Sequence, residues 1–317
     1  MEFPALDLAR FEAASPAGRR AIGAEVDSIC RATGFLNLTG HGVPEPTIAT
    51  LWRAAEAFFA LPMPHKLAAK APVPGYPYGY LPPLAESLAR SQGVNAPPDL
   101  KESFNGGPEA APSDLDDAEA LAFCYAPTIW PEAPAGFRAA WSDYYRAMES
   151  LAARVMRVFA TALDLPEAFF APFIDSAVSA LRALNYPALQ RPPEAGQIRA
   201  GAHTDYGSLT ILLPQAGSRG LEIFSPEGRW VEIPPAPGAF VINIGDLMAR
   251  WTNDRWVSTL HRVVVPPNGG AERRQSFAFF HQPNWDAVIT PLPGEAPKYA
   301  PVRSGPYLMA KFKSTTM

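Results

Sequence analysis

The chain has 317 residues, of which 48% are apolar and 18% are charged. This composition supplies enough apolar side chains for a sizeable core and excludes a disordered chain. The 27 Lys and Arg residues nearly balance the 31 Asp and Glu residues, for a net charge of −4, so electrostatics gives no reason to expect nucleic acid or an anionic membrane as a partner.

The N-terminal part of the chain is predicted to alternate between short strands and helices. Strands are expected at 3–8 and 34–38, where apolar residues lie between turn signals. Residues 16–32 are predicted to form a helix capped by Ser15, and a second helix is expected to begin near Glu45. No leader peptide and no stretch of roughly 18 apolar residues is evident, so we expect a cytoplasmic protein with no membrane partner.

Residues 62–134 contain 14 prolines and are predicted to be irregular chain that wraps over a core and rims a pocket. No proline occurs between Pro134 and Pro166, and large apolar side chains recur there at spacings of three and four. This periodicity predicts a long amphipathic helix packed on the core.

After about residue 177 the chain consists of short β-type runs separated by turn residues. The expected strands lie at 181–186, 208–213, 221–224, 230–233, 240–244, 261–265 and 275–280. Short strands with regular turn punctuation predict a sandwich or barrel of antiparallel sheets.

Three residues in this β-region have the pattern of a metal site. His203 and Asp205 are two positions apart, so in extended chain they project to the same face. His261 begins another predicted strand. Two imidazoles and one carboxylate on one side of a metal leave the opposite positions open, as in non-haem Fe(II) oxygenases.

Arg274 and Ser276 lie in the last predicted strand, and alternation points both side chains the same way. An arginine offers a rigid fork for a carboxylate, and the serine hydroxyl adds one donor. The alternative is a surface Arg274 paired with Glu272.

Taken together, these motifs resemble the isopenicillin N synthase-like family of 2-oxoglutarate/Fe(II)-dependent oxygenases. The residues that carry the resemblance are His203-Thr204-Asp205, His261-Arg262-Val263, Arg274-Gln275-Ser276, Gly40-His41-Gly42-Val43-Pro44, Asn185-Tyr186-Pro187 and Pro283-Asn284-Trp285-Asp286. The resemblance implies a mixed α and β fold, with a double-stranded β-helix (jelly-roll) core and a helical N-terminal region.

The resemblance also implies four regions along the chain. Residues 1–135 would form an N-terminal region of the non-haem dioxygenase type, and residues 136–176 a long supporting helix. Residues 177–285 would form the Fe(II)/2-oxoglutarate oxygenase β-core, and residues 286–317 a C-terminal tail.

The implied activity is that of a dioxygenase that hydroxylates or desaturates a small-molecule substrate with O2 and releases succinate and CO2 from 2-oxoglutarate. By similarity, His203, Asp205 and His261 bind Fe(II), and the distal carboxylate of 2-oxoglutarate reaches Arg274 and Ser276. Tyr186 is expected to donate a hydrogen bond to the cosubstrate or the substrate. Asn185 is a weaker candidate for cosubstrate binding, because alternation places it on the opposite side of the strand.

The substrate is expected to contact the segment 75–105, the loop 246–256 and a short C-terminal helix. The candidate contact residues are Tyr80, Lys101, Phe104 and Arg182. Lys101 and Arg182 have the charge to bind an acidic group, but each is equally suited to an ordinary salt bridge.

Three alternatives remain open at the level of sequence. The same motifs occur in oxidases and cyclases of this family that use no 2-oxoglutarate. A zinc hydrolase also accepts two histidines and a carboxylate, although no H-E-x-x-H element appears. A non-catalytic barrel that only binds a ligand is the third alternative. The sequence does not determine the oligomeric state.

Overall fold

The computed structural model describes residues 3–234, 236–266, 272–294 and 296–316. Most residues of each of the four regions expected from the sequence are therefore described. Among the described residues, no helix combines the length and the apolar character that a membrane crossing requires.

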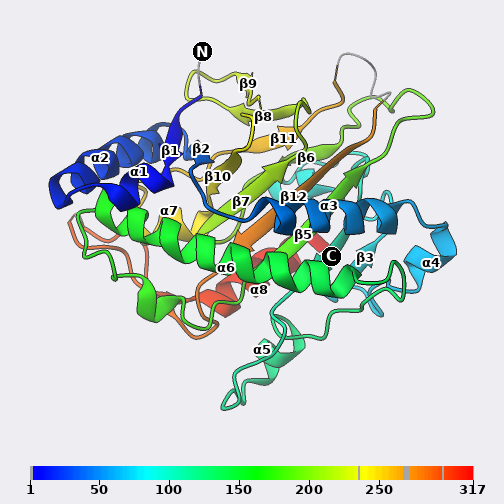
Figure 1. Ribbon diagram of the computed structural model, residues 1–317, viewed down its shortest axis with the longest axis horizontal. Coiled ribbons are helices and arrows are strands. Elements are labelled where there is room, and N and C mark those ends of the chain that lie inside the picture. Colours follow the sequence, from blue (N-terminus) through cyan, green and yellow to red (C-terminus); the bar gives the residue numbers. More distant parts are fainter. Residues whose placement is uncertain (1–2, 235, 267–271, 295, 317) are drawn as a thin grey trace.

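Two sheets form the centre of the molecule (Figure 1). The large sheet has eight strands in the order β1-β2-β10-β7-β12-β5-β4-β3, and the small sheet has four in the order β6-β11-β8-β9. All of their pairings are antiparallel except β1 with β2. The antiparallel sheets confirm the predicted jelly-roll core.

The strands of the large sheet are β1 (Ala5–Asp7), β2 (Phe35–Thr39), β3 (Gly79–Leu81), β4 (Glu102–Gly106), β5 (Ala180–Tyr186), β7 (Leu209–Pro214), β10 (Phe240–Ile244) and β12 (Arg274–His281). Those of the small sheet are β6 (Ala200–His203), β8 (Leu221–Phe224), β9 (Trp230–Glu232) and β11 (His261–Val263). A separate ribbon pairs β13 (Val288–Ile289) with β14 (Val302–Arg303).

The inner faces of the two sheets pack against each other. Leu184, Val241 and Ala278 of the large sheet share one buried cluster with Ile223 and Val263 of the small sheet. The functional side chains expected from the sequence lie on strands of both sheets, so this packing brings them to a common interior.

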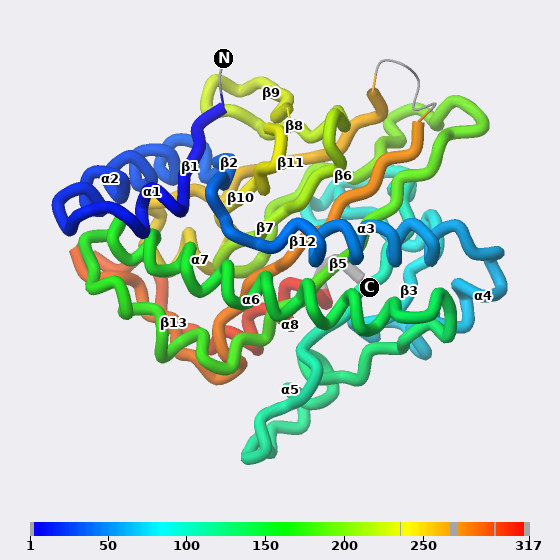
Figure 2. Tube along the Cα trace, in the orientation of Figure 1, coloured from blue at the N-terminus to red at the C-terminus, as the bar shows by residue number. Residues whose placement is uncertain are grey.

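Helices surround the sheets, and α3 and α6 pack on the outer face of the large sheet. The helices are α1 (Leu8–Ala13), α2 (Pro16–Ala32), α3 (Glu45–Phe59), α4 (Met63–Leu67), α5 (Ala118–Ala122), α6 (Phe137–Ala162), α7 (Asp246–Trp251) and α8 (Ser304–Thr316), with 3-10 helices η1 (Leu88–Gln92) and η2 (Ala171–Phe173). Figure 2 shows α6 crossing the large sheet. Helices α1 and α2 lie near one end of α6, and α4 lies near its other end. Trp52 of α3 and Tyr144 of α6 both pack on the ring of Phe277 in β12.

The helix predicted over 16–32 is confirmed, and the Ser15 hydroxyl caps it by accepting a hydrogen bond from the Gly18 N–H. The predicted long helix is present as α6 (Phe137–Ala162) and does not extend to residue 176, whereas the core strands are confirmed within a few residues. The strand expected at 3–8 is shorter, at Ala5–Asp7, because the Asp7 side chain accepts from the Arg10 N–H and starts α1 at Leu8.

The proline-rich segment contains more regular structure than its composition predicts. Pro62 is followed directly by α4, since proline at the start of a helix loses no intrahelical hydrogen bond. Strands β3 and β4 extend the large sheet beyond β5. This extension brings the segment against the functional interior.

Two of the residues expected to contact substrate, Tyr80 and Phe104, lie instead in the outer core. Phe104 is fully buried and packs on Phe58 of α3 and on Trp141 of α6. The Tyr80 hydroxyl donates to the Glu102 carboxylate. Both side chains point away from the interior between the sheets, because alternation in β3 and β4 places them on the helix-covered face.

Replacing Phe104 by alanine is expected to lower the free energy of unfolding by about 3–5 kcal/mol, because a buried aromatic ring leaves a cavity. The affinity of the folded variant for small-molecule ligands should not change. Urea denaturation measures the first effect and calorimetric titration the second. A Phe104→Ala variant with normal stability and impaired ligand binding would show that the ring contacts ligand after all.

Candidate active site

His203, Asp205 and His261 come together between the two sheets. His203 ends β6, His261 begins β11, and the two residues are direct partners in the antiparallel register. The Asp205 Oδ1 atom lies 3.8 Å from the Nε2 atom of each histidine. One ligand atom from each residue lies within 4.8 Å of the other two, a spacing that suits a single metal ion.

Hydrogen bonds orient all three side chains toward that point. Nδ1 of His203 lies 2.8 Å from the Gly201 carbonyl, and Nδ1 of His261 lies 3.1 Å from the Thr259 carbonyl. A carbonyl oxygen only accepts, so each Nδ1 carries the proton and each Nε2 keeps its lone pair for a metal.

The carboxylate of Asp205 is fixed by two donors on its other oxygen. Thr210 and Asn243 donate to Oδ2 at 2.5 Å and 2.7 Å. Oδ1 therefore remains available as a ligand. Burial raises the pKa of Asp205, but the two neighbouring imidazoles and these hydrogen bonds outweigh that effect, so the pKa lies below its ordinary value. Burial and repulsion from His261 lower the pKa of His203 to about 3, so its ring is neutral near pH 7.

Two glycines allow the loops around the triad to approach closely. The Gly245 Cα lies so near Gly207 that a Cβ there would come within 2.2 Å of the Gly207 carbonyl oxygen. The Asp246 N–H then donates to the Asp205 carbonyl at 2.7 Å. This contact ties the loop after β10 to the backbone of the carboxylate residue.

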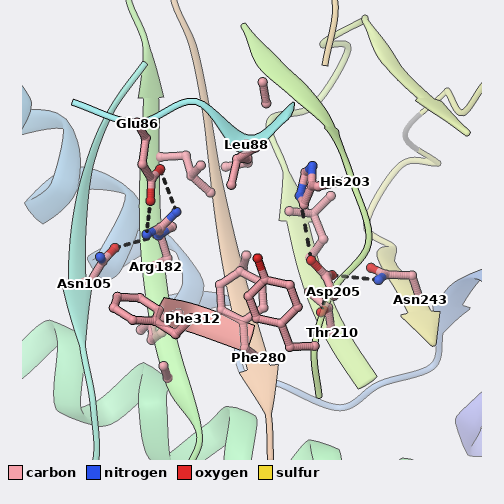
Figure 3. Close-up of a pocket in the computed structure, with 18 of the residues that line it drawn as sticks. Glu86, Leu88, Asn105, Arg182, His203, Asp205, Thr210, Asn243, Phe280 and Phe312 are labelled. Carbon is pink, nitrogen blue, oxygen red and sulfur yellow. Dashed lines mark hydrogen bonds and ion pairs between the residues drawn. The ribbon is translucent and has the colours of Figure 1, made fainter. Parts of the chain in front are cut away.

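A cavity of about 210 Å³ adjoins the triad. At one end it is lined by Tyr186, Arg274 and Ser276, and at the other by Arg182, Glu86 and Asn105. Figure 3 shows Phe312 beside the Arg182 group, and Phe280 between this group and the His203–Asp205 side.

Arg274 is buried without an acidic partner among the described residues. Its Nε donates to the Ser218 hydroxyl at 3.2 Å, and its guanidinium lies 4.9 Å from the centre of the Tyr186 ring. Its buried Nη1 has no hydrogen-bond partner in the part of the chain that the structure describes. The alternative pairing with Glu272 is therefore wrong. An orphaned, buried N–H on a cation is costly unless a ligand supplies the acceptor.

A second buried arginine, Arg199, lies on the same side of the cavity. Its guanidinium is 5.9 Å from the Tyr186 ring centre, and it donates to the Glu272 carbonyl at 2.7 Å. Burial and the nearby charge of Arg274 lower the pKa of Arg199. Two cations that repel each other in this way give the Tyr186 end of the cavity a positive potential.

Asn185 points away from the cavity, as alternation with Tyr186 implies. Its Nδ2 donates to the Glu102 Oε1 at 2.7 Å, and the Lys66 ammonium donates to Oε2 of the same carboxylate at 2.8 Å. The structure therefore does not bring Asn185 to the cavity. Instead, Asn185 links β5 to β4 through this hydrogen bond with Glu102, on the outer face of the large sheet.

Arg182, in contrast, lines the cavity, where it forms a bidentate ion pair with Glu86. Its Nη1 and Nη2 atoms donate to Glu86 at 3.1 Å and 2.9 Å, and its Nε donates to the side-chain oxygen of Asn105 at 2.8 Å. Lys101 lies behind this pair, with Nζ 3.2 Å from Glu86 and 2.8 Å from Asp99. Lys101 itself does not line the cavity.

The ion pairs of Glu86 predict a pH dependence of stability. Despite burial, Arg182 and Lys101 lower the pKa of Glu86 from 4.5 to about 2. A carboxyl with a depressed folded-state pKa contributes stability above pH 4.5 and loses it as the pH falls toward 2, here up to about 3 kcal/mol.

Glu86→Gln should therefore destabilise the protein at pH 5, and its deficit relative to the parent should shrink as the pH falls to 3. Urea unfolding at pH 5, 4 and 3 measures this difference. A deficit that stays constant across these pH values would contradict the assignment.

The C-terminal helix α8 closes the cavity on one side. Leu308 and Phe312 of α8 line it, and the Lys311 ammonium donates to Asp246 at 2.8 Å. The expected short C-terminal helix is thus confirmed.

Sequence reasoning missed the partners that orient the site. Asn243 had a signal, since it is the only polar residue within the apolar strand at 240–244. No sequence signal indicated Glu86 and Asn105, because both lie in the proline-rich segment, where no periodic pattern predicts the path of the chain.

Comparison with known proteins agrees with this geometry. The sequence profile of the 2OG-Fe(II) oxygenase superfamily matches residues 178–283, and the profile described as the non-haem dioxygenase in morphine synthesis N-terminal region matches residues 3–133. The 2-oxoglutarate-Fe(II) type oxidoreductase hxnY of Emericella nidulans is 33% identical, over 94% of this chain and 86% of that protein. The validamycin A dioxygenase of Streptomyces hygroscopicus subsp. limoneus is 32% identical, over 91% and 79%.

Among solved structures, a full-length Neurospora crassa protein in complex with alpha-KG superposes with a TM-score of 0.86 and 30% identity, covering 98% of this chain and 96% of that one. The same protein with alpha-KG and thymine gives a TM-score of 0.85, also at 30% identity, over 98% and 96%. The fold, the triad and these relatives together show that the chain belongs to the 2OG-Fe(II) oxygenase superfamily and is an Fe(II)- and 2-oxoglutarate-dependent dioxygenase.

Proposed function

We propose that His203, Asp205 and His261 hold the iron, that Arg274 and Ser276 bind the distal carboxylate of 2-oxoglutarate, and that the enzyme hydroxylates or desaturates a small molecule. The observation that carries this proposal is that the three ligand residues line one cavity together with Arg274, whose Nη1 has no hydrogen-bond partner among the described residues.

The residues present suit both groups. Two imidazole nitrogens and one carboxylate oxygen on one side are the donor set of non-haem Fe(II) sites, which leave positions for other ligands. The dicarboxylate 2-oxoglutarate needs a cation at its far end. Arg274 has a free N–H there, Ser276 adds a hydroxyl, and Arg199 contributes positive potential.

When bound, iron with 2-oxoglutarate and O2 supplies the oxidising chemistry, and 2-oxoglutarate ends as succinate and CO2. The protein's own residues position and enclose the reactants. Thr210 and Asn243 hold Oδ2 of Asp205, which would leave Oδ1 available to the metal. Leu308 and Phe312 of α8 limit the access of water to the cavity.

The substrate side of the cavity is proposed to be the end near Arg182. The presence of thymine in the Neurospora crassa structure supports a small organic substrate. Relatives named for proline, homoarginine and validamycin A show that names alone do not select one substrate class. The free, buried Cys30 and Cys124 support the proposed cytoplasmic location.

Succinate formation tests the proposed function. The protein is incubated aerobically with Fe(II) and 2-oxoglutarate, and succinate is quantified by mass spectrometry, with and without candidate substrates. We expect succinate that depends on Fe(II) and does not form under anaerobic conditions. As a matched control, 2-oxovalerate, which lacks the distal carboxylate, should be a poor cosubstrate. Absence of succinate under all conditions, with no measurable binding of 2-oxoglutarate, would overturn the proposal.

A further inference from the structure

The charged residues at the substrate end of the cavity form an electrically balanced cluster. Arg182 and Lys101 both pair with Glu86, and Lys101 also pairs with Asp99. Each of these four side chains exposes 15% or less of its surface. Two cations and two carboxylates cancel, so this end of the cavity carries no net charge for a ligand to neutralise.

Two residues at this end, Arg182 and Asn105, line the cavity and have N–H groups beyond those used in their hydrogen bonds. Arg182 uses one N–H on each of its three nitrogens for Asn105 and Glu86, and a guanidinium has five N–H groups, so two remain. The bond from Arg182 fixes the amide orientation of Asn105, whose Nδ2 makes only a long contact of 3.4 Å to the Pro77 carbonyl. The ligand group that matches these donors is an acceptor such as a carbonyl oxygen.

Aromatic and aliphatic side chains also line the cavity near these polar groups. Phe280 of β12 and Phe312 of α8 lie next to the Arg182 group, as Figure 3 shows. Val178 and Leu308 also line the cavity. Two rings from different elements beside a polar group favour a flat apolar body, because aromatic faces pack well on other rings.

We propose that the substrate is an uncharged ring compound with a carbonyl group, which accepts hydrogen bonds from Arg182 and Asn105 while its ring packs on Phe280 and Phe312. This inference rests on the proposed function, since it assigns the opposite end of the same cavity to 2-oxoglutarate. A substrate carboxylate or ammonium would leave an uncompensated charge beside a balanced cluster, and burying such a charge is costly.

The competing interpretation is that Arg182 captures a substrate carboxylate. Against it, Glu86 already occupies the Nη1 and Nη2 fork that would bind a carboxylate bidentately. Lys101 behind it is committed to Glu86 and Asp99. An acidic substrate would have to displace Glu86 and leave that carboxylate with fewer partners.

Ring compounds of similar size that carry a neutral, an anionic or a cationic substituent test the inference. Wild-type protein loaded with Mn(II) and 2-oxoglutarate is titrated calorimetrically with thymine and 5-carboxyuracil, and with 4-methylbenzamide, 4-methylbenzoate and 4-methylbenzylamine. We expect a neutral compound to bind at least about tenfold more tightly than its charged counterparts. A carboxylate or amine that binds as tightly as its neutral partner, or a failure of both neutral compounds to bind, would overturn the inference.

Glu86→Gln provides a second test, because it leaves the Arg182 charge without its main partner. The variant should shift the ratio of carboxylate to neutral affinity toward the carboxylate by at least about tenfold. Glu12→Gln is the matched control, since it makes the same change in an ion pair with Arg154, at 2.7 Å, outside the cavity. An unchanged ratio in folded Glu86→Gln would count against the inference, and the wild-type comparison stands if that variant does not fold.

Titration of 2-oxoglutarate into the Mn(II) protein shows whether a negative result concerns only the inferred substrate class or also the proposed function. If 2-oxoglutarate binds but charged ring compounds are preferred, only the inferred substrate class is wrong. If 2-oxoglutarate does not bind, the proposed function fails as well.

Discussion

Asp205→Ala is expected to reduce succinate formation by more than about a thousandfold, because the metal loses its only anionic protein ligand among the described residues. Binding of Mn(II) should fall below detection in the same variant, while the far-UV circular dichroism spectrum remains that of the parent. Calorimetric titration with Mn(II) and a succinate assay measure the two effects.

A graded series makes this prediction specific. Asn243→Leu removes one of the two donors to Asp205 Oδ2 but leaves all three ligands, so metal affinity should fall by about 10- to 100-fold. Asp143→Ala, which removes an exposed carboxylate paired with Arg146 on α6, should leave metal binding unchanged. Retention of full activity in Asp205→Ala would place the metal elsewhere.

Arg274→Met is expected to weaken binding of 2-oxoglutarate to the Mn(II) protein by about 2–5 kcal/mol, the usual cost of removing one partner from a buried charged pair. That energy corresponds to a factor of about 30 to several thousand in Kd. Methionine keeps the aliphatic stem, so the loss reports on the guanidinium, whose Nη1 is buried and has no protein partner among the described residues.

Two controls separate this role from a structural one. Arg199→Met removes the second cation near Tyr186 but no N–H that lines the cavity, so its effect should be below about tenfold. The Arg274 effect should also vanish for 2-oxovalerate, which has no distal carboxylate. Equal losses for both keto acids would mean that Arg274 only supports the fold.

The sequence predicted which side chains would meet around His203 and Arg274, because local geometry largely determines it, and the structure brings these side chains to one cavity. His203 and Asp205 are two residues apart, and so are Arg274 and Ser276, so alternation in extended chain directs each pair to one face. The pairing of β6 with β11 that joins His261 to them is a long-range contact, and the family resemblance supplied it.

The substrate end was predicted only in part, for a physical reason. Phe104 and Asn105 are neighbours in β4, so one faces the helices and the other the cavity. The sequence does not show which of the two residues faces the cavity, because a shift of one residue in the strand register exchanges the two faces. Glu86 lies in a proline-rich connection, and its partner Arg182 is 96 residues away. Only the assembled sheet brings them together.

A crystal structure with Mn(II) and 2-oxoglutarate would show directly which residues bind each of them. We expect one ion bound by Nε2 of His203, Nε2 of His261 and Oδ1 of Asp205, with the distal carboxylate of 2-oxoglutarate on Arg274 and Ser276. An ion bound away from these three residues, or a 2-oxoglutarate whose distal carboxylate pairs with Arg182 instead of Arg274, would contradict this expectation.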